Sequence, residues 1–237
     1  MPDQVDTRIS PALHAQNVQE IDGYDDLTAP YLAPTETAFS AAYQGCIAVF
    51  DARAKAATNP EWNEAAQIIA TDDFARKHLD RISRTFDGVR INLEKGITHI
   101  EAQLTAPITS KAAQSIAAEV RSFVRGMDTE KRHGFIQQAL DSGDDVTITA
   151  LLGAPAYLSG LNADFQQSYT RLYHERNSPE VAKRLLAMQG AKAMIEERAG
   201  LVFIEMEKAI GCPPAKAKRL REAKTAAEKA FIMNDAV

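Results

Sequence analysis

A row of apolar residues at helical spacing constrains the fold of this chain more than any other feature of its sequence. The steps along the row are three or four residues and average about 3.6, the period of one face of a straight α-helix. A left-handed supercoil would require a period of about 3.5. The row consists of Ala75, Leu79, Ile82, Phe86, Val89, Leu93, Ile97, Ile100 and Leu104. It predicts a single straight helix roughly 45 Å long.

A second apolar row predicts a helix of similar length nearer the C-terminus. Its members are Val181, Leu185, Met188, Ile195, Ala199, Val202, Met206 and Ala209. Gly211 is a typical C-cap for this helix, and Pro213-Pro214 would stop it. About one residue in six is alanine and only 7% are aromatic, a composition that favours closely packed helices over sheets. We therefore expect an all-α fold, an elongated helical bundle built on two long antiparallel helices.

Capping residues and glycines refine the prediction for the first long helix. Asn59 is expected to cap its N-terminal extension, with Pro60 in the first helical position, and the extension joins the apolar row with or without a break at Thr71-Asp72-Asp73. Gly88 and Gly96 lie inside the helix, where each lowers helix stability by about 1 kcal/mol relative to alanine. We interpret both glycines as places where another backbone approaches closely. A preceding helix is expected over residues 34–58.

Short helices rather than strands are expected over residues 128–161. Asp128 is a candidate N-cap, and the turn Ser142-Gly143-Asp144 precedes a short helix over residues 146–152. The helical region that follows is expected to restart or kink at Asn177-Ser178-Pro179.

The net charge of -5 is concentrated near the N-terminal end of the chain. Residues 1–33 contain one base, Arg8, and few large apolar residues, which disfavours an independent core. The six acids of this segment are Asp3, Asp6, Glu20, Asp22, Asp25 and Asp26. We expect an extended acidic arm over 1–33, with a short helix near residues 10–20, then a helical bundle over 34–211 and a basic helix over 212–237.

The last helix, expected from Ala215 to about Met233, carries the strongest electrostatic feature. Residues 214–229 contain six cations and only two acids. We assign the cations as candidate partner-binding residues: Lys216, Lys218, Arg219, Arg221, Lys224 and Lys229. The apolar side of the helix consists of Leu220, Ala223, Ala227 and Phe231. Such a helix could contact nucleic-acid phosphates, an anionic partner surface or the acidic arm of a neighbouring subunit, or it could be an ordinary solvated face. Because no aromatic residues are interleaved with the cations, sequence-specific DNA recognition is not expected.

Sequence patterns for catalysis and metal binding are incomplete. Di-iron bundles use two Glu-x-x-His pairs, and this chain has one, Glu130 with His133. His174-Glu175 lacks the second histidine of a zincin, and the common nucleotide-binding loops are absent. Acidic pairs such as Asp72-Asp73 are interpreted as turn or helix-start chemistry, as are Asp25-Asp26 and Asp144-Asp145. We therefore expect no cofactor and no enzymatic role, while an enzyme with an unrecognised site stays open.

The remaining sequence signals concern compartment. Cys46 and Cys212 lie among apolar residues without a second cysteine or histidine nearby, so we expect buried free thiols. No apolar run approaches the roughly 20 residues that cross a membrane, and the first six residues show no secretory signal. We expect a protein without membrane insertion, made in the cytoplasm.

The segment from Asp128 to Leu161, DTEKRHGFIQQALDSGDDVTITALLGAPAYLSGL, together with the helix after it, resembles helical head and neck proteins of tailed bacteriophages. The resemblance covers about the C-terminal half and carries over no residue roles. It implies a structural subunit of a virion or of its assembly, with itself or other particle proteins as partners. The alternatives are a cytosolic helical adaptor with one protein partner, and an enzyme.

Overall fold

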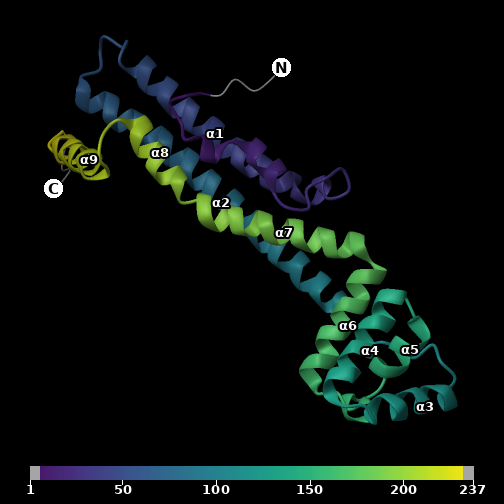
Figure 1. Cartoon of the computed structure of the whole chain (residues 1–237). Coiled ribbons are helices and arrows are strands. Elements are labelled where there is room, and N and C mark those ends of the chain that lie inside the picture. Colours follow the sequence, from purple (N-terminus) through teal and green to yellow (C-terminus); the bar gives the residue numbers. More distant parts are fainter. Residues whose placement is uncertain (1–5, 232–237) are drawn as a thin grey trace, which may run out of the picture. The chain divides into compact units, whose positions relative to one another are not determined.

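A computed structural model describes residues 6–231, and within that range every regular element is a helix (Figure 1). The α-helices are α1 (Ala29–Ala56), α2 (Glu64–Leu104), α3 (Gln114–Arg125), α4 (Thr129–Ser142), α5 (Asp145–Leu152), α6 (Ala163–Asn177), α7 (Pro179–Arg198), α8 (Leu201–Ile210) and α9 (Pro214–Lys229). Three short 3-10 helices are η1 (Pro11–Leu13), η2 (Ala15–Glu20) and η3 (Ala156–Ser159). The predicted all-α class is confirmed. Asp3 of the acidic arm and the predicted helix end at Met233 lie outside the described residues.

The chain is divided into two compact units. Unit 1 consists of Met1–Glu94 and Leu186–Val237, and unit 2 consists of Lys95–Leu185. Unit 2 is therefore one continuous segment, whereas unit 1 is built from both ends of the chain. The boundaries drawn from charge, after residues 33 and 211, stay predictions.

The first predicted rod is confirmed as α2, one continuous helix of 41 residues. In unit 1 its apolar row is buried at Ala75, Ile82 and Phe86, among other positions. Phe86 meets Phe39 of α1 edge to face, with ring centroids 5.1 Å apart. The two long helices that pack together are therefore α1 and α2.

The predicted start of this helix at Asn59 and Pro60 is wrong. The Asn59 side chain accepts a hydrogen bond from the amide of Glu61 within a turn. Asn63 is the cap instead, because its Oδ1 accepts the amide of Ala66 at 2.9 Å, two residues into α2. The two asparagines lie four positions apart, and the side chain of each accepts a hydrogen bond from a backbone N–H group.

The second predicted rod is interrupted, so a single helix over 181–209 is wrong. The chain restarts at Pro179, as predicted, and α7 then ends at Arg198. Around Ala199-Gly200 the backbone hydrogen bonds join residues three positions apart, as in a turn, instead of four apart as in an α-helix. The Val202 amide, for example, donates to the Ala199 carbonyl at 3.3 Å. Glycine here weakens the continuous helix that the apolar row alone suggests. The C-cap of α8 at Gly211, with φ at 74°, is confirmed.

Close approach at Gly88 is also wrong, because among residues 6–231 no atom beyond the adjacent helix backbone lies within 4 Å of the position that a Cβ would take there. The approach predicted at Gly96 stays a prediction. Gly45 of α1 is a true contact glycine, since a Cβ there would lie 2.8 Å from Cδ1 of Ile82 on α2. At Gly190 of α7 the Cβ position is 2.5 Å from Cγ2 of Ile21, so this glycine makes room for the N-terminal segment.

The described part of the predicted arm is not extended, although the short helix expected near residues 10–20 is present as η1 and η2. Ile9, Leu13, Val18 and Ile21 are buried, and the first two short helices, η1 and η2, pack on α1. These four side chains supply apolar contacts that were not expected from the proline content and acidity of the segment. The α1 helix itself begins at Ala29, before the predicted start at residue 34.

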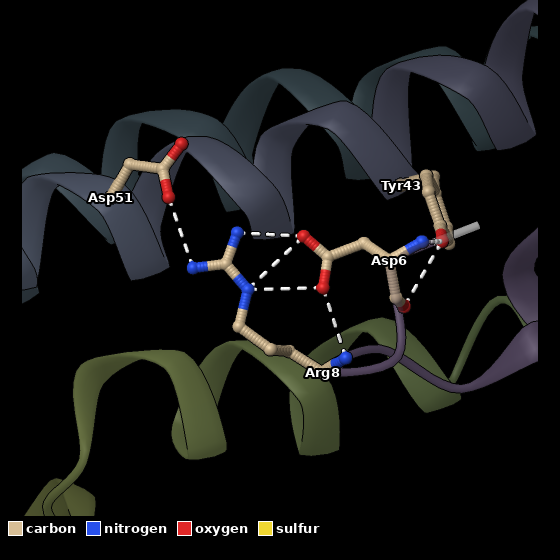
Figure 2. Close-up of polar contacts among 4 residues, drawn as sticks. All are labelled: Asp6, Arg8, Tyr43 and Asp51. Carbon is tan, nitrogen blue, oxygen red and sulfur yellow. Dashed lines mark hydrogen bonds and ion pairs between the residues drawn. The ribbon is translucent and has the colours of Figure 1, made fainter. Parts of the chain in front are cut away.

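A set of polar contacts fixes the beginning of this segment on α1 (Figure 2). The Arg8 guanidinium bridges Asp6, at 2.6 Å, and Asp51 of α1, at 3.0 Å. The Asp6 amide donates to the Tyr43 hydroxyl at 2.7 Å, and that hydroxyl donates to the Asp6 carbonyl at 3.1 Å. The hydrogen bonds from Arg8 lower the pKa of the Asp6 carboxyl. Arg8 also lies over the Phe50 ring, 5.1 Å from its centroid.

Unit 2 is a cluster of short helices, as predicted for residues 128–161. Its core contains Val124, Ile136, Leu140, Ile148, Leu151 and Tyr169. Three side chains cap its helices: the carboxylates of Asp128 and Asp144 accept the amides of Lys131 and Thr147, and the Asn162 side chain accepts that of Phe165. The β-branched run after Asp144 lies in α5, in which the five consecutive residues from Ile148 to Leu152 are all buried.

Candidate interaction surface

The α9 helix positions the predicted cations at the end of unit 1 where α1 ends and α2 begins (Figure 1). Gly211 turns the chain out of α8 in the left-handed conformation, and Pro213 in an extended conformation leads into α9. Pro214 occupies the first turn, where its missing N–H leaves no helical hydrogen bond unmade. Alanine and long charged side chains then sustain the helix.

Two of the six cations hold α9 on α2. Nζ of Lys216 lies 2.7 Å from Oε1 of Glu64, and Nη2 of Arg221 lies 2.6 Å from Oδ2 of Asp72 and also contacts Asp73. The hydrogen bond with Lys216 lowers the pKa of the Glu64 carboxyl, and the bond to Asp72 raises the pKa of Arg221. Because the Asp72 side chain is only 7% exposed, its pair is the better shielded from solvent and from salt.

The other four cations remain on the solvent side. Lys218 pairs with Glu222 at 3.9 Å and Lys224 with Glu228 at 3.7 Å, both within α9. Exposed pairs at this spacing contribute only a few tenths of a kcal/mol. Arg219 and Lys229 are in no ion pair with any residue between 6 and 231. These four are therefore the cations that α9 can offer to a partner.

The predicted apolar side of α9 is largely uncovered. Ala217 is its one buried residue, and Leu220 is half-buried. From residue 222 to residue 231 every side chain is exposed, including Ala223 and Ala227, and Phe231 is 87% exposed. The helix, with Phe231 two residues after its end, thus presents alanines, a phenylalanine and cations together.

Sequence reasoning missed the acids that receive α9. Asp72 and Asp73 were interpreted as turn or helix-start residues, and that prediction is wrong because both lie inside the continuous α2 helix. Asp72 also binds Arg76, one turn later on α2, at 3.0 Å. The signal that could have identified them is the unbroken apolar row on either side, which leaves no turn for them to occupy. For Asp25 and Asp144 the turn and cap interpretation is confirmed.

A polar hollow of about 230 Å³ lies where α9 meets the other helices of unit 1. Its charged lining consists of Arg53 of α1, Glu64 and Lys216. Cys212 lies close by, and burial raises the pKa of its thiol, with a smaller contribution from Asp72. Burial likewise raises the pKa of the Cys46 thiol to about 12. Both cysteines are buried and free, as predicted.

The two histidines considered for metal binding, His133 and His174, make contacts within unit 2. Nδ1 of His133 lies 2.7 Å from the Tyr169 hydroxyl in the unit 2 core, and Nε2 of His174 lies 2.9 Å from the Ala106 carbonyl. In the described part of the chain, no three His, Cys, Asp or Glu side chains are grouped so that they could hold a metal ion. A cleft of about 530 Å³ in unit 2 is lined by neutral residues such as Gln166, Gln167 and Thr170. Among residues 6–231, no helix has the length and apolar character needed to cross a membrane.

No family model, no curated protein and no solved structure matches this chain.

Proposed function

We propose that this protein is a structural subunit that assembles with copies of itself, and that α9 is part of the contact. The observation that carries the proposal is the exposure of every side chain from residue 222 to residue 231. A helix of this length is marginal in water unless an apolar face packs on something. A partner that covered Ala223, Ala227 and Phe231 would supply that packing.

The finer proposal is a component of a bacteriophage particle or of its assembly. It is supported by the resemblance of the segment from residue 128 to residue 161 to head and neck proteins. On this proposal the protein would be made in the host cytoplasm and incorporated into the virion.

Light scattering coupled to size-exclusion chromatography tests self-assembly. The full chain, with a mass of 25.9 kDa, is compared with a chain that ends at Pro213 and so lacks α9. Among the described residues, the truncation removes a single buried side chain, Ala217, so circular dichroism should show the remaining helices intact. We expect the full chain to exceed its monomer mass increasingly with concentration, and the shortened chain to be monomeric. A full chain that stays monomeric at all concentrations would contradict the proposed function.

A further inference from the structure

A strongly acidic surface lies at the beginning of α1. The sequence contains no lysine or arginine between Arg8 and Arg53. Glu20, Asp22 and Asp26 are exposed there, and none of the three forms an ion pair within residues 6–231. Leu27 is 64% exposed and Tyr31 is 45% exposed in the same segment. We call residues 20–31 the acidic surface; like α9, it combines exposed charge with exposed apolar area.

The two surfaces lie at opposite ends of α1 within unit 1 (Figure 1). The acidic surface surrounds the start of α1, whereas the hollow that joins Arg53, Glu64 and Lys216 places α9 at its end. A helix of 28 residues is about 42 Å long. That separation is several Debye lengths at physiological salt, so the two surfaces cannot neutralise one another within one copy.

We propose that α9 of one copy docks on the acidic surface of a second copy. This inference rests on the proposed function and names the partner surface. Arg219 and Lys229 would meet the unpaired carboxylates, while Phe231 and the alanines of α9 would pack on Leu27 and Tyr31. Opposite charges that are unpaired within each chain become paired between chains, and apolar area is buried on both sides.

The contact uses two different patches, so it leaves one patch of each kind open in a dimer. Such a heterologous contact generates a closed ring when the rotation between neighbours permits, and an open filament otherwise. Both outcomes suit a subunit of a larger structure.

A nucleic acid is the less favoured partner for α9. Nucleic-acid binding that ignores sequence depends on many phosphate contacts. Lys216 and Arg221 are already bound to α2, and Lys218 and Lys224 are partly neutralised within α9. The exposed phenylalanine and alanines have a counterpart in Leu27 and Tyr31, and a phosphate backbone offers none.

A charge-exchange experiment on the full chain tests this docking. One variant carries Arg219→Glu and Lys229→Glu, and the other carries Asp22→Lys and Asp26→Lys. All four residues are exposed and make no ion pair in the described structure, so neither variant should lose stability. A control for the first variant, Lys77→Glu with Arg84→Glu, makes the same change of charge at exposed positions on α2.

We expect each variant alone to be monomeric in light scattering and the control to associate like the wild type. Mixing the two variants in equal amounts should restore association, because an acidic α9 now faces a basic partner surface. Raising the ionic strength should weaken association in the wild type and in the mixture.

Three outcomes would overturn the proposal. Variants that associate like the wild type would exclude this docking and leave only the self-assembly of the proposed function standing. Variants that are monomeric both alone and mixed, with α9-dependent binding of duplex DNA by the wild type, would assign α9 to nucleic acid. A wild type that never associates would remove the proposed function itself.

Discussion

Gly153 lies at a point in unit 2 where the backbone of a neighbouring segment leaves no room for a side chain. A Cβ there would lie 2.7 Å from the Thr149 carbonyl oxygen and 2.9 Å from both the Ile108 oxygen and the Ser110 nitrogen. These are backbone atoms, so relief requires the two segments to separate. At Gly88 of α2, by contrast, the same position is open.

We therefore expect Gly153→Ala and Gly88→Ala to change stability in opposite directions. Gly153→Ala should lower the free energy of unfolding by about 1–3 kcal/mol, as overpacking does. Gly88→Ala should raise it by about 0.5–1 kcal/mol, because alanine favours the helix. Urea unfolding followed by circular dichroism measures both. A loss of stability in Gly88→Ala would show that another segment does approach α2 there.

His78 is expected to make the stability of unit 1 depend on pH. Its ring packs edge to face on Phe74, with centroids 4.6 Å apart, and burial followed by the charge of Arg81 lowers its pKa below the ordinary value of 6.5. The unfolded chain then binds the proton more readily than the folded chain does. The stability due to neutral His78 is complete above pH 6.5 and is lost as the pH falls through the lowered pKa.

The expected consequence is a difference between the wild type and His78→Gln. Between pH 7.5 and pH 5.5, thermal unfolding of the wild type should shift further downward than that of the variant, because glutamine has no proton to bind. Equal shifts in the two proteins would mean that His78 does not contribute to the pH dependence.

Among the elements, α5 depends on its cap. The Asp144 carboxylate accepts the Thr147 amide at 3.0 Å, and this bonding lowers the pKa of Asp144. Asp144→Ala should lower the free energy of unfolding by about 1 kcal/mol. Asp144→Asn should keep most of this capping contribution, because asparagine also caps helices well. Denaturant unfolding of the two variants checks this, and equal losses would show that charge rather than capping is the stabilising factor.

The attachment of α9 depends on Arg221 more than on its other cations. Removing this side chain leaves the buried Asp72 carboxylate with Arg76 alone. We expect the α9 amides of Arg221→Gln to exchange roughly tenfold faster, the effect of losing a charge-assisted hydrogen bond of about 1.5 kcal/mol. Lys224→Gln, whose partner Glu228 belongs to the same helix, should leave exchange nearly unchanged. Hydrogen-exchange mass spectrometry of α9 distinguishes the two, and similar rates in both variants would contradict this role of Arg221.

Elements whose signals are local could be predicted from the sequence. The apolar period of α2 and the caps at Asp128 and Asp144 repeat or act within a few residues, so the pattern itself contains the answer. The break at Ala199-Gly200 was missed because the apolar row continues through it unchanged. The choice between Asn59 and Asn63 was also beyond local rules, since both residues can cap.

At the scale of the whole molecule, only part of the candidate surface could be predicted from the sequence. The six cations could be identified because they crowd into one helix. Their acidic partners could not, because Lys216 and Glu64 lie 152 positions apart, and Arg221 and Asp72 lie 149 apart. The fold of residues 6–28 was missed for a related reason: η1 and η2, with Leu13 and Val18 buried, pack on α1, and the composition of a segment does not indicate such distant partners.

The construction of unit 1 from both ends of the chain also sets an order of events during translation. Residues 95–185 leave the ribosome as a complete unit, and domains generally fold as units once they are available. The α8 helix, which packs on α1 and brings Met206 near Gly45, is synthesised only after residue 200. Through most of synthesis, α1 therefore exposes the side that α8 later covers. The nascent chain is expected to fold its middle unit first, while α1 keeps this side exposed until residues 201–210 have been made.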